Sequence, residues 1–398
     1  MNYAKNEIMQ YVGEDDVKFI RLAFCDVFGR QKNMAILPGE LDRAFDYGIP
    51  FDARSIEGFE SANSDLFLKP DSSTLMGMPW RPDHDKVVRM LSDITYSNGE
   101  RYECDTRYIL QKAIKAADEM GLRFKFGTEQ EFYLFELDQN GKPTDIPYDE
   151  AGYMDLAPDD KGENIRREIC LTLEQIGIHP ENSHHERGPG QNEIDVQHAD
   201  PLLAADNLVI FEMIVKIVAG RNGLKADFSP LPIKDKAGSG LHINVSVKAK
   251  DGNDYLSQVM AGVLSKIAEM TIFFNTTRQS YERLGKNGAP RYITWSESNR
   301  SQLVRFPDTQ GRRRIAELRS PDCTTNPYLA FALIIYAGIY GIKNNLQLPE
   351  SVDKNPDRIS GGYDKLPESF EEACKLASES EFLKEVLPEE ILNFYCRR

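Results

Sequence analysis

The chain has 398 residues, and its 48 lysines and arginines against 63 aspartates and glutamates give a formal net charge of −15. Hydrophobic residues make up 41% of the chain, which is enough for a packed core and excludes wholesale disorder. An acidic chain without a basic tract argues against nucleic-acid binding, because neutralising phosphates needs a basic face. The length predicts two domains.

The sequence contains no segment typical of a membrane span or of a signal peptide. The longest apolar run, Tyr328 to Ile342, is too short to cross a bilayer and is predicted to be a buried helix. The six cysteines are scattered without a Cys-x-x-Cys pair, which favours free thiols over a disulfide framework or a cysteine zinc site. We therefore expect a cytoplasmic protein with neither a membrane nor a nucleic-acid partner.

The first 102 residues are predicted to form a small β-rich domain. Alternating apolar residues over Val17–Asp26 and a second segment at Asn33–Leu37, separated by the turn Phe28-Gly29-Arg30, predict a β-hairpin. A further strand is predicted over Val87–Ile94. The domain is expected to end just before a helix over Thr106–Met120, which Asp105 caps.

The second domain, residues 103–398, mixes helices and strands, so the predicted fold class is α+β. The predicted helices are Glu163–Ile176, Leu202–Gly220, Tyr255–Phe274, Pro327–Ile342 and two short ones after Pro367. Four predicted strands carry apolar residues on one face and Glu, His or Arg on the other: Arg123–Glu136, Asn192–His198, Leu241–Val247 and Ile315–Arg319. An ordinary half-solvated antiparallel sheet would also alternate. Glu and His in glycine-rich segments favour a curved antiparallel sheet, flanked by helices, whose polar face forms one site.

Two glutamates on the longest predicted strand are the first site candidates. Glu129 and Glu131 point the same way, because side chains two residues apart in a strand share a face. Without cations the two carboxylates would repel each other, and one would stay protonated. Each could instead hold a different ion of a metal pair.

A Gly-Pro-Gly turn between Glu186 and Glu193 is the second candidate. The turn can reverse the chain so that the two carboxylates converge. A surface turn with solvated acids would explain the same residues. His184 and His185, just before it, are interpreted as turn histidines rather than ligands.

His242 follows Gly238-Ser239-Gly240 at the start of a strand, where glycines let the backbone approach a ligand closely. An isolated histidine is more often structural, but four candidate carboxylates elsewhere make a ligand role competitive. Glu317 and Arg319 share one face of the last strand. Single arginines are weak signals, but their guanidinium groups suit carboxylate and phosphate, and the candidates are Arg283, Arg300 and Arg305.

Together these candidates comprise five glutamates and one histidine. An oxygen-rich donor set without sulfur favours Mg²⁺ or Mn²⁺ over zinc. The sequence has neither GxxxxGK[ST] nor a strand followed by GxGxxG, so a P-loop and a Rossmann site are excluded. Phosphoryl transfer would then depend on metal ions and arginines.

Six motifs occur in this order along the chain: GTEQEF, HERGPGQNEID, GSGLH, SYERL, APRYITWSESNRSQLVRFP and AELRSPDCTTNPYLA. Together they resemble the bacterial-type glutamine synthetase family, and the resemblance runs from about residue 17 to residue 395. It implies an N-terminal β-grasp domain, a larger catalytic domain and a homo-oligomer. The oligomer would be a hexameric ring or a stacked dodecamer, with each site at a junction of subunits. The chain ends at Arg398 without the family's inter-ring tail.

The resemblance implies two groups of metal ligands. Glu131, Glu186 and Glu193 resemble the ligands of the ion beside the acceptor carboxylate. The ion on the ATP side would have the ligands Glu129, His242 and Glu317. Two or three Mg²⁺ or Mn²⁺ ions per site are expected, with ATP as co-substrate.

The resemblance also assigns the substrate contacts. Arg283 and Arg319 resemble the arginines on the α- and γ-carboxylates of glutamate. Gly238 and His242 are expected in the same substrate site. Arg300 and Arg305 resemble the phosphate arginines, and Ser246 lies on the nucleotide side. The expected catalytic residues are Arg300, Arg319 and Asp52, the last lent by a neighbouring subunit to the ammonium site.

The implied chemistry has two steps: ATP phosphorylates the γ-carboxylate of glutamate, and ammonia or an amine then displaces phosphate. The chain departs from the family around the amine. A flap that typically reads RLVPGYEAP is here Arg283–Pro290, one residue shorter and without its glutamate. In the aspartate loop, Ala53-Arg54 replaces Gly-Ser. Ala237 stands where the family has Asn, and Leu231 where it has Lys.

Three functions follow from these residues. The first is an ATP-dependent carboxylate–amine ligase, either glutamine synthetase or a γ-glutamyl-polyamine or alkylamine ligase. A non-catalytic sensor or structural ring is the second, and the complete set of metal ligands argues against it. A glycosidase built on paired carboxylates is the third. The additional glutamates, His242 and the arginines argue against that.

Overall fold

The structure is a computed structural model that describes residues 5–60, 62, 64–81, 84–310, 314–356 and 362–397. The chain divides into two compact units. The first comprises residues 1–109 with 174–177, and the second comprises residues 110–173 with 178–398.

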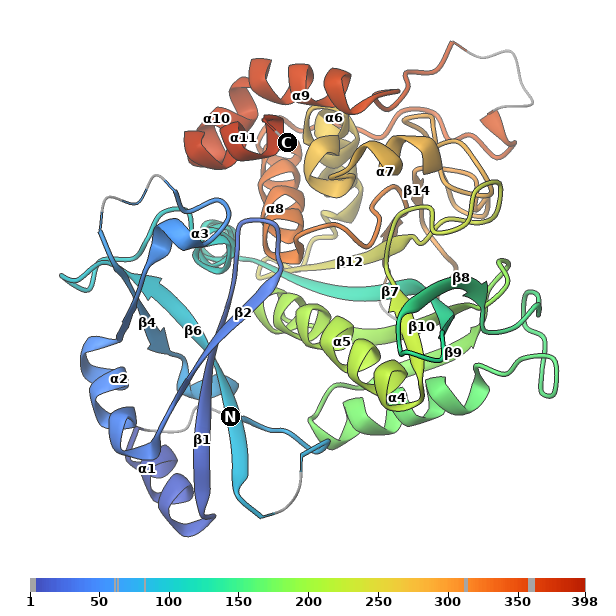
Figure 1. Ribbon diagram of the computed structural model, residues 1–398. Helices are drawn as coiled ribbons and strands as arrows, with labels where there is room; N and C mark the ends of the chain where they lie inside the picture. The colour runs from blue at the N-terminus through green and yellow to red at the C-terminus, as the bar shows by residue number, and fades with distance from the viewer. Residues whose placement is uncertain are drawn as a thin grey trace. The chain divides into compact units, whose positions relative to one another are not determined.

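The first unit contains a six-stranded sheet in the order β2-β1-β6-β4-β3, with β5 paired to β6 (Figure 1). Its strands are β1 (Val17–Cys25), β2 (Gln31–Ile36), β3 (Ile49–Phe51), β4 (Leu66–Pro70), β5 (Met76–Gly77) and β6 (Lys86–Thr95), and its helices are α1 (Lys5–Glu14) and α2 (Leu41–Tyr47). The predicted hairpin is confirmed as β1 and β2. A parallel pairing of β1 with β6 completes the β-grasp arrangement.

The predicted hairpin turn and the predicted helix cap both depend on aspartates. The Asp26 carboxylate accepts the N–H groups of Phe28 at 3.0 Å and Arg30 at 2.9 Å, which closes the turn between β1 and β2. Asp105 accepts the N–H of Arg107 at 3.0 Å, so it satisfies a donor in the first turn of α3 (Thr106–Glu119).

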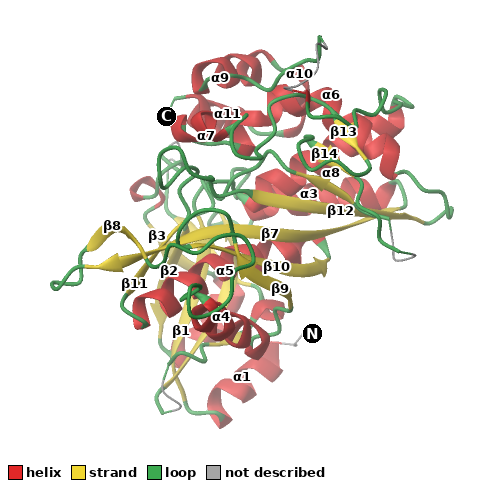
Figure 2. Cartoon of the chain, turned by 90° about the vertical axis from the view of Figure 1, so that its right-hand side faces the viewer, coloured by secondary structure: helices red, strands yellow, loops and turns green. Residues whose placement is uncertain are grey.

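The second unit is built on a nine-stranded sheet in the order β13-β14-β15-β12-β7-β10-β9, with β8 and β11 also paired to β7. Figure 2 shows the long strand β7 in the middle of this sheet, between β12 and β10. The strands are β7 (Leu122–Leu137), β8 (Pro143–Pro147), β9 (Pro180–His185), β10 (Gln191–Ala199), β11 (Leu224–Asp227), β12 (Leu241–Ala249), β13 (Trp295–Ser296), β14 (Val304–Arg305) and β15 (Ala316–Leu318).

The four strands predicted for the second domain are confirmed as β7, β10, β12 and β15, and the α+β class is confirmed with them. The sheet is antiparallel except for the short parallel pair β13 and β14. The expectation of an antiparallel sheet is therefore corrected to a mixed sheet, because the two-residue strands β13 and β14 at its edge run parallel to each other.

Helices cover the apolar face of β7. The ring of Phe126 stacks on Phe331 of α8 with centroids 4.2 Å apart, and Gln130 contacts Glu212 of α5. The larger helices are α4 (Glu163–Gln175), α5 (Pro201–Arg221), α6 (Leu256–Phe274) and α8 (Pro327–Lys343). Three short helices follow, not the two expected: α9 (Phe370–Glu379), α10 (Glu381–Val386) and α11 (Glu389–Cys396). The opposite face of β7, which carries Glu129 and Glu131, is left for the site.

One helix in the described part of the chain, α6, has the length and apolar composition of a membrane span. Most of it is buried against α8 and α9, so its composition is that of a core helix. The prediction for α8 as a buried helix is confirmed. None of the six cysteines, all of which lie in the described part of the chain, forms a disulfide.

Candidate active site

Strand register collects the predicted site residues into one row. On the β10 side of β7, Glu193 lies opposite Glu131 and Asp195 opposite Glu129. On the other side, His242 of β12 lies opposite Glu129. Further along the sheet, β15 pairs with β12 and β14 with β15, which adds Glu317 and Arg305. Residues far apart in sequence thus become neighbours because they occupy consecutive strands.

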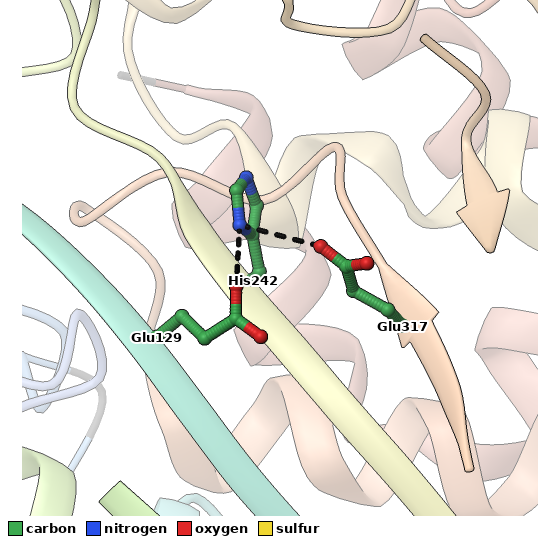
Figure 3. A group of neighbouring side chains, drawn as sticks. All are labelled: Glu129, His242 and Glu317. Atoms are coloured by element: carbon green, nitrogen blue, oxygen red, sulfur yellow. Dashed lines mark hydrogen bonds and ion pairs between the residues drawn. The ribbon is translucent and has the colours of Figure 1, made fainter. Parts of the chain in front are cut away.

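Glu129, His242 and Glu317 form the first cluster (Figure 3). The Nδ1 atom of His242 lies 3.0 Å from Glu129 Oε2 and 3.5 Å from Glu317 Oε1. Each residue offers one ligand atom, and the three atoms lie within 4.8 Å of one another. The amide of Asn244 donates to Glu129 Oε1 at 2.8 Å, which orients that carboxylate. These three residues are the set expected on the ATP side.

The charge state of Glu129 is controlled by its neighbours. Burial alone would raise its pKa. The hydrogen bond and charge of His242, the amide of Asn244 and the charge of Arg319 outweigh burial and lower the pKa of Glu129 to about 2. Glu129 is therefore ionised at neutral pH and available as a ligand.

His184, Glu186 and Glu193 form the second cluster. His184 Nε2 lies 3.3 Å from Glu186 Oε1 and 3.7 Å from Glu193 Oε2, and the three ligand atoms lie within 4.8 Å. The expected convergence of Glu186 and Glu193 is therefore confirmed. The interpretation of His184 as a turn histidine is wrong, because it lies in β9 in register with Glu193.

Glu131 lies beside the second cluster. Its Oε2 atom accepts the N–H of Gly240 at 2.7 Å and the amide of Gln191 at 3.2 Å. A β-carbon on Gly240 would stand 2.7 Å from Arg283 Nη2, so the guanidinium of Arg283 lies close against the backbone of Gly240. Burial is the main cause that raises the pKa of Glu131, and the charge of Glu186 adds to it.

Asp195 extends the acidic face as a third group with Glu129 and Glu193. Burial and the charge of Glu129 raise the pKa of Asp195 to about 7, and burial with the charge of Glu131 raises the pKa of Glu193 well above its usual range. Burial and mutual repulsion therefore both disfavour ionisation of these neighbouring carboxylates. The donors are carboxylates and two imidazoles, so the residues fit a hard divalent cation such as Mg²⁺ or Mn²⁺.

The clusters open into a cavity of about 830 Å³. Most of the predicted site residues line it: Glu129, Glu131, Glu186, Glu193, Gly238, His242, Arg283, Arg300, Arg305 and Arg319. Glu317 reaches the first cluster from β15. Ser246 is buried in β12 and is not among the described lining residues. Asp52 belongs to the first unit, where its carboxylate accepts the N–H of Arg54 and the hydroxyl of Ser55.

Three of the arginines are held in place by the second unit itself. Arg305 donates to Glu317 Oε2 at 3.0 Å, and Arg319 donates to the other oxygen, Oε1. Arg283 donates to the carbonyl of Ser320 at 3.0 Å. Two guanidinium groups therefore fix the buried Glu317 carboxylate, and both arginines also line the cavity.

A buried network beneath the Glu186 turn could not be foreseen from the sequence. His185 contacts Asp149 Oδ1 through Nε2 at 2.8 Å and the carbonyl of Glu186 through Nδ1 at 2.7 Å. Asp149 also accepts the N–H of Gly190 at 2.9 Å. The pair is almost fully buried and ties both ends of the turn to the β8–α4 connection. His185, too, lies in β9 rather than in the turn.

Replacing Asp149 with Ala is expected to destabilise the protein by about 3–5 kcal/mol, because it leaves a buried imidazole and a backbone N–H without their acceptor. Urea unfolding followed by circular dichroism measures the loss. The matched control is Asp145→Ala, which removes an exposed carboxylate from β8. An Asp149→Ala protein as stable as this control would contradict the role given to the pair.

Family models and relatives of known class match almost the whole chain. The family model "Glutamine synthetase, catalytic domain" matches residues 103–398, and "Glutamine synthetase, beta-Grasp domain" matches residues 16–97. A glutamine synthetase of Clostridium saccharobutylicum is 41% identical, over 99% of this chain and 93% of its own length. One from Methanosarcina mazei is also 41% identical, over 98% of this chain and 92% of its own.

Solved structures with a similar fold match the chain over nearly its whole length. One described as a GmaS/ADP complex has a TM-score of 0.88 at 25% identity, and covers 100% of this chain and 94% of that one. A Plasmodium falciparum glutamine synthetase shares the fold, with a TM-score of 0.88 at 22% identity, over 99% and 95% of the two chains. The chain belongs to the glutamine synthetase family. It is an ATP-dependent carboxylate–amine ligase of that type.

Proposed function

We propose that the chain converts glutamate, ATP and ammonia or an amine into glutamine or a γ-glutamyl amide, with ADP and phosphate as the other products. The observation that carries this proposal is a shared cavity in the second unit. Two carboxylate–imidazole clusters and five arginines line or reach it. A non-catalytic sensor would need neither cluster.

The two clusters are the proposed holders of two or three Mg²⁺ or Mn²⁺ ions. Glu129, His242 and Glu317 would hold one, and Glu131, Glu186 and Glu193 another, with His184 and Asp195 within reach. When bound, such ions supply positive charge that stabilises a transferring phosphoryl group.

The protein's own residues bind and orient the substrates. Arg283 is proposed to hold the α-carboxylate of glutamate beside Gly238, and Arg319 is proposed to hold the γ-carboxylate near His242. Arg300 and Arg305 are proposed to contact the ATP phosphates, with Ser246 on the nucleotide side. The similar structure described as an ADP complex supports a nucleotide in this fold. Guanidinium groups suit these anions because they donate in pairs.

The amine step is proposed to need a second subunit. Asp52 would reach the amine site of a neighbour, which implies a ring of subunits, either a hexamer or a stacked dodecamer. The Asp52 carboxylate suits an ammonium cation, because the hydroxyl of Ser55 lowers its pKa and keeps it ionised. A cytoplasmic location is part of the same proposal.

A larger amine is the second candidate for the acceptor, and the flap favours it. Residues 284–290 contain no carboxylate, and the position directly before Ala289-Pro290 is Gly288, with φ of +99°. The flap is held at its tip by Asn287, whose amide donates to the carbonyl of Lys236 at 2.6 Å. A flap without a carboxylate accepts the ammonium proton poorly and leaves more room for a substituted amine.

We therefore expect ammonia to be a weak acceptor compared with substituted amines. Initial rates with glutamate and ATP measure this, with ammonia, methylamine, ethanolamine and putrescine as the acceptors. If ammonia gives the highest kcat/KM by about tenfold, a difference of about 1.4 kcal/mol, the larger-amine candidate is wrong and glutamine formation stands.

A further inference from the structure

Arg187 lies at the flap end of the cavity, and none of the assigned roles uses it. Its N–H donates to Glu186 Oε2 at 2.9 Å, and the turn that follows is closed by the N–H of Glu186 on the carbonyl of Gln191 at 2.8 Å. The side chain is exposed and lines the cavity. Among the described residues, no side-chain acceptor or carboxylate is found on its guanidinium. A fixed backbone therefore presents an unneutralised cation.

The flap brings a second cation to the same cavity. Lys286 is exposed, lines the cavity, and has no carboxylate partner in the described part of the chain. Its N–H donates to the carbonyl of Arg283 at 3.1 Å, and its carbonyl accepts the N–H of Ala289 at 2.9 Å, so the flap forms a defined turn.

Arg187 and the flap meet at Gly288. A β-carbon on Gly288 would stand 3.6 Å from Arg187 Nη1. The φ of +99° at this position favours glycine, and because glycine has no side chain, the space beside the Arg187 guanidinium stays open. The carboxylates nearby, Glu186 and Glu193, belong to a proposed metal cluster. The free charge at the flap is therefore positive, which suits an anion and repels a cationic tail.

We propose that the acceptor is a primary amine that carries a carboxylate, such as a small amino acid, and that Arg187 and Lys286 bind this carboxylate. The inference rests on the proposed function and specifies the chemical class of the acceptor amine. The amine nitrogen attacks the γ-carbonyl carbon of γ-glutamyl phosphate. The C–N bond forms, the C–O bond to phosphate breaks with its electron pair on the leaving phosphate, and the nitrogen releases one proton to water. The product is a γ-glutamyl amino acid.

Three acceptors with the same three-carbon spacing test the charge alone: β-alanine, propylamine and 1,3-diaminopropane, with an anionic, an apolar and a cationic end. We expect kcat/KM to be highest for β-alanine, and about tenfold or more above 1,3-diaminopropane. Arg187→Ala should lower kcat/KM for β-alanine about tenfold and leave propylamine within about twofold. Lys286→Ala should give a smaller loss in the same direction. Lys375→Ala, which removes an exposed charge from α9, should change nothing.

Hydroxylamine separates this inference from the proposed function, because it traps γ-glutamyl phosphate without needing a carboxylate. Hydroxamate formation by wild type and by Arg187→Ala shows that the ligase chemistry and the fold are intact. If hydroxamate forms but β-alanine has no advantage, the inference alone is overturned. The same result, and the same conclusion, is expected if Asp52 of a neighbouring subunit neutralises the charge of Arg187. The inference is also overturned if Arg187→Ala raises the KM for glutamate instead. Arg187 would then bind a carboxylate of glutamate and not that of the acceptor amine. No turnover with any acceptor, hydroxylamine included, overturns both.

Discussion

Glu131→Gln and His242→Ala are each expected to lower glutamate- and ATP-dependent phosphate release by about 100-fold or more. His242 contacts both Glu129 and Glu317, so removing its imidazole opens the first cluster. Glu131 is partly buried opposite Glu193, and replacing its carboxylate with an amide would put a neutral group where the donor set needs a charge. Coupled ATP turnover with saturating Mg²⁺ measures both effects.

The matched control is Glu390→Gln, which removes an exposed carboxylate from α11. Mn²⁺ binding followed by electron paramagnetic resonance gives a second readout, because loss of a ligand should weaken binding even where turnover is too low to measure. Turnover that resists a chelator, or variants within about threefold of wild type, a difference under 1 kcal/mol, would refute the assignment of the clusters.

The central strands could be predicted from the sequence because their chemistry alternates. Strand β7 carries Phe124, Phe126 and Phe132 on one face and the two site glutamates on the other, and the structure keeps that division. Apolar helices such as α8 are equally clear, because long apolar runs leave few alternatives. The two candidate metal-binding clusters were predictable in part, because the sequence places glutamates and a histidine on the polar faces of these strands.

What the sequence could not show comes from long-range pairing. Strand β9 reads PENSHH, which has no apolar alternation, because it lies at the edge of the sheet and pairs on one side only. His184 therefore resembles a turn residue until its register with Glu193 is known. The partnership of His185 with Asp149 spans 36 residues and leaves no local pattern. Asp195 shares a face with Glu193 in the sequence pattern, but only the pairing with β7 brings it to Glu129.

The same limit applies to the acceptor. The flap and the segment after Glu186 are separate in sequence, and neither contains a pattern that predicts Arg187 beside Gly288. Single cations in loops are common on acidic chains. Only the cavity that both side chains line connects Arg187 and Lys286 with the carboxylate proposed for the acceptor.

Mixing two inactive variants is expected to restore activity if Asp52 acts in a neighbouring subunit. Asp52→Ala removes the carboxylate proposed for the amine, and Arg319→Ala removes a guanidinium that holds Glu317 and faces the cavity. Each variant alone should lose about 100-fold or more in turnover. In a mixed ring, a junction is complete when the Arg319→Ala subunit supplies Asp52 and the Asp52→Ala subunit supplies Arg319. Random mixing in equal amounts makes about a quarter of the junctions complete.

The experiment dissociates and reassembles the two variants together, with native mass spectrometry on differently tagged subunits to show that rings are mixed. Activity near a quarter of wild type is the expected result, and rings of each variant treated alone are the control. The position of Asp52 makes the test sharp, because its carboxylate is exposed and its hydrogen-bond donors, Arg54 and Ser55, are local. Removing it should therefore leave the first unit folded. Rings that are mixed by mass but remain inactive would show that Asp52 does not complete a neighbour's site, and the proposed shared amine site would then be wrong.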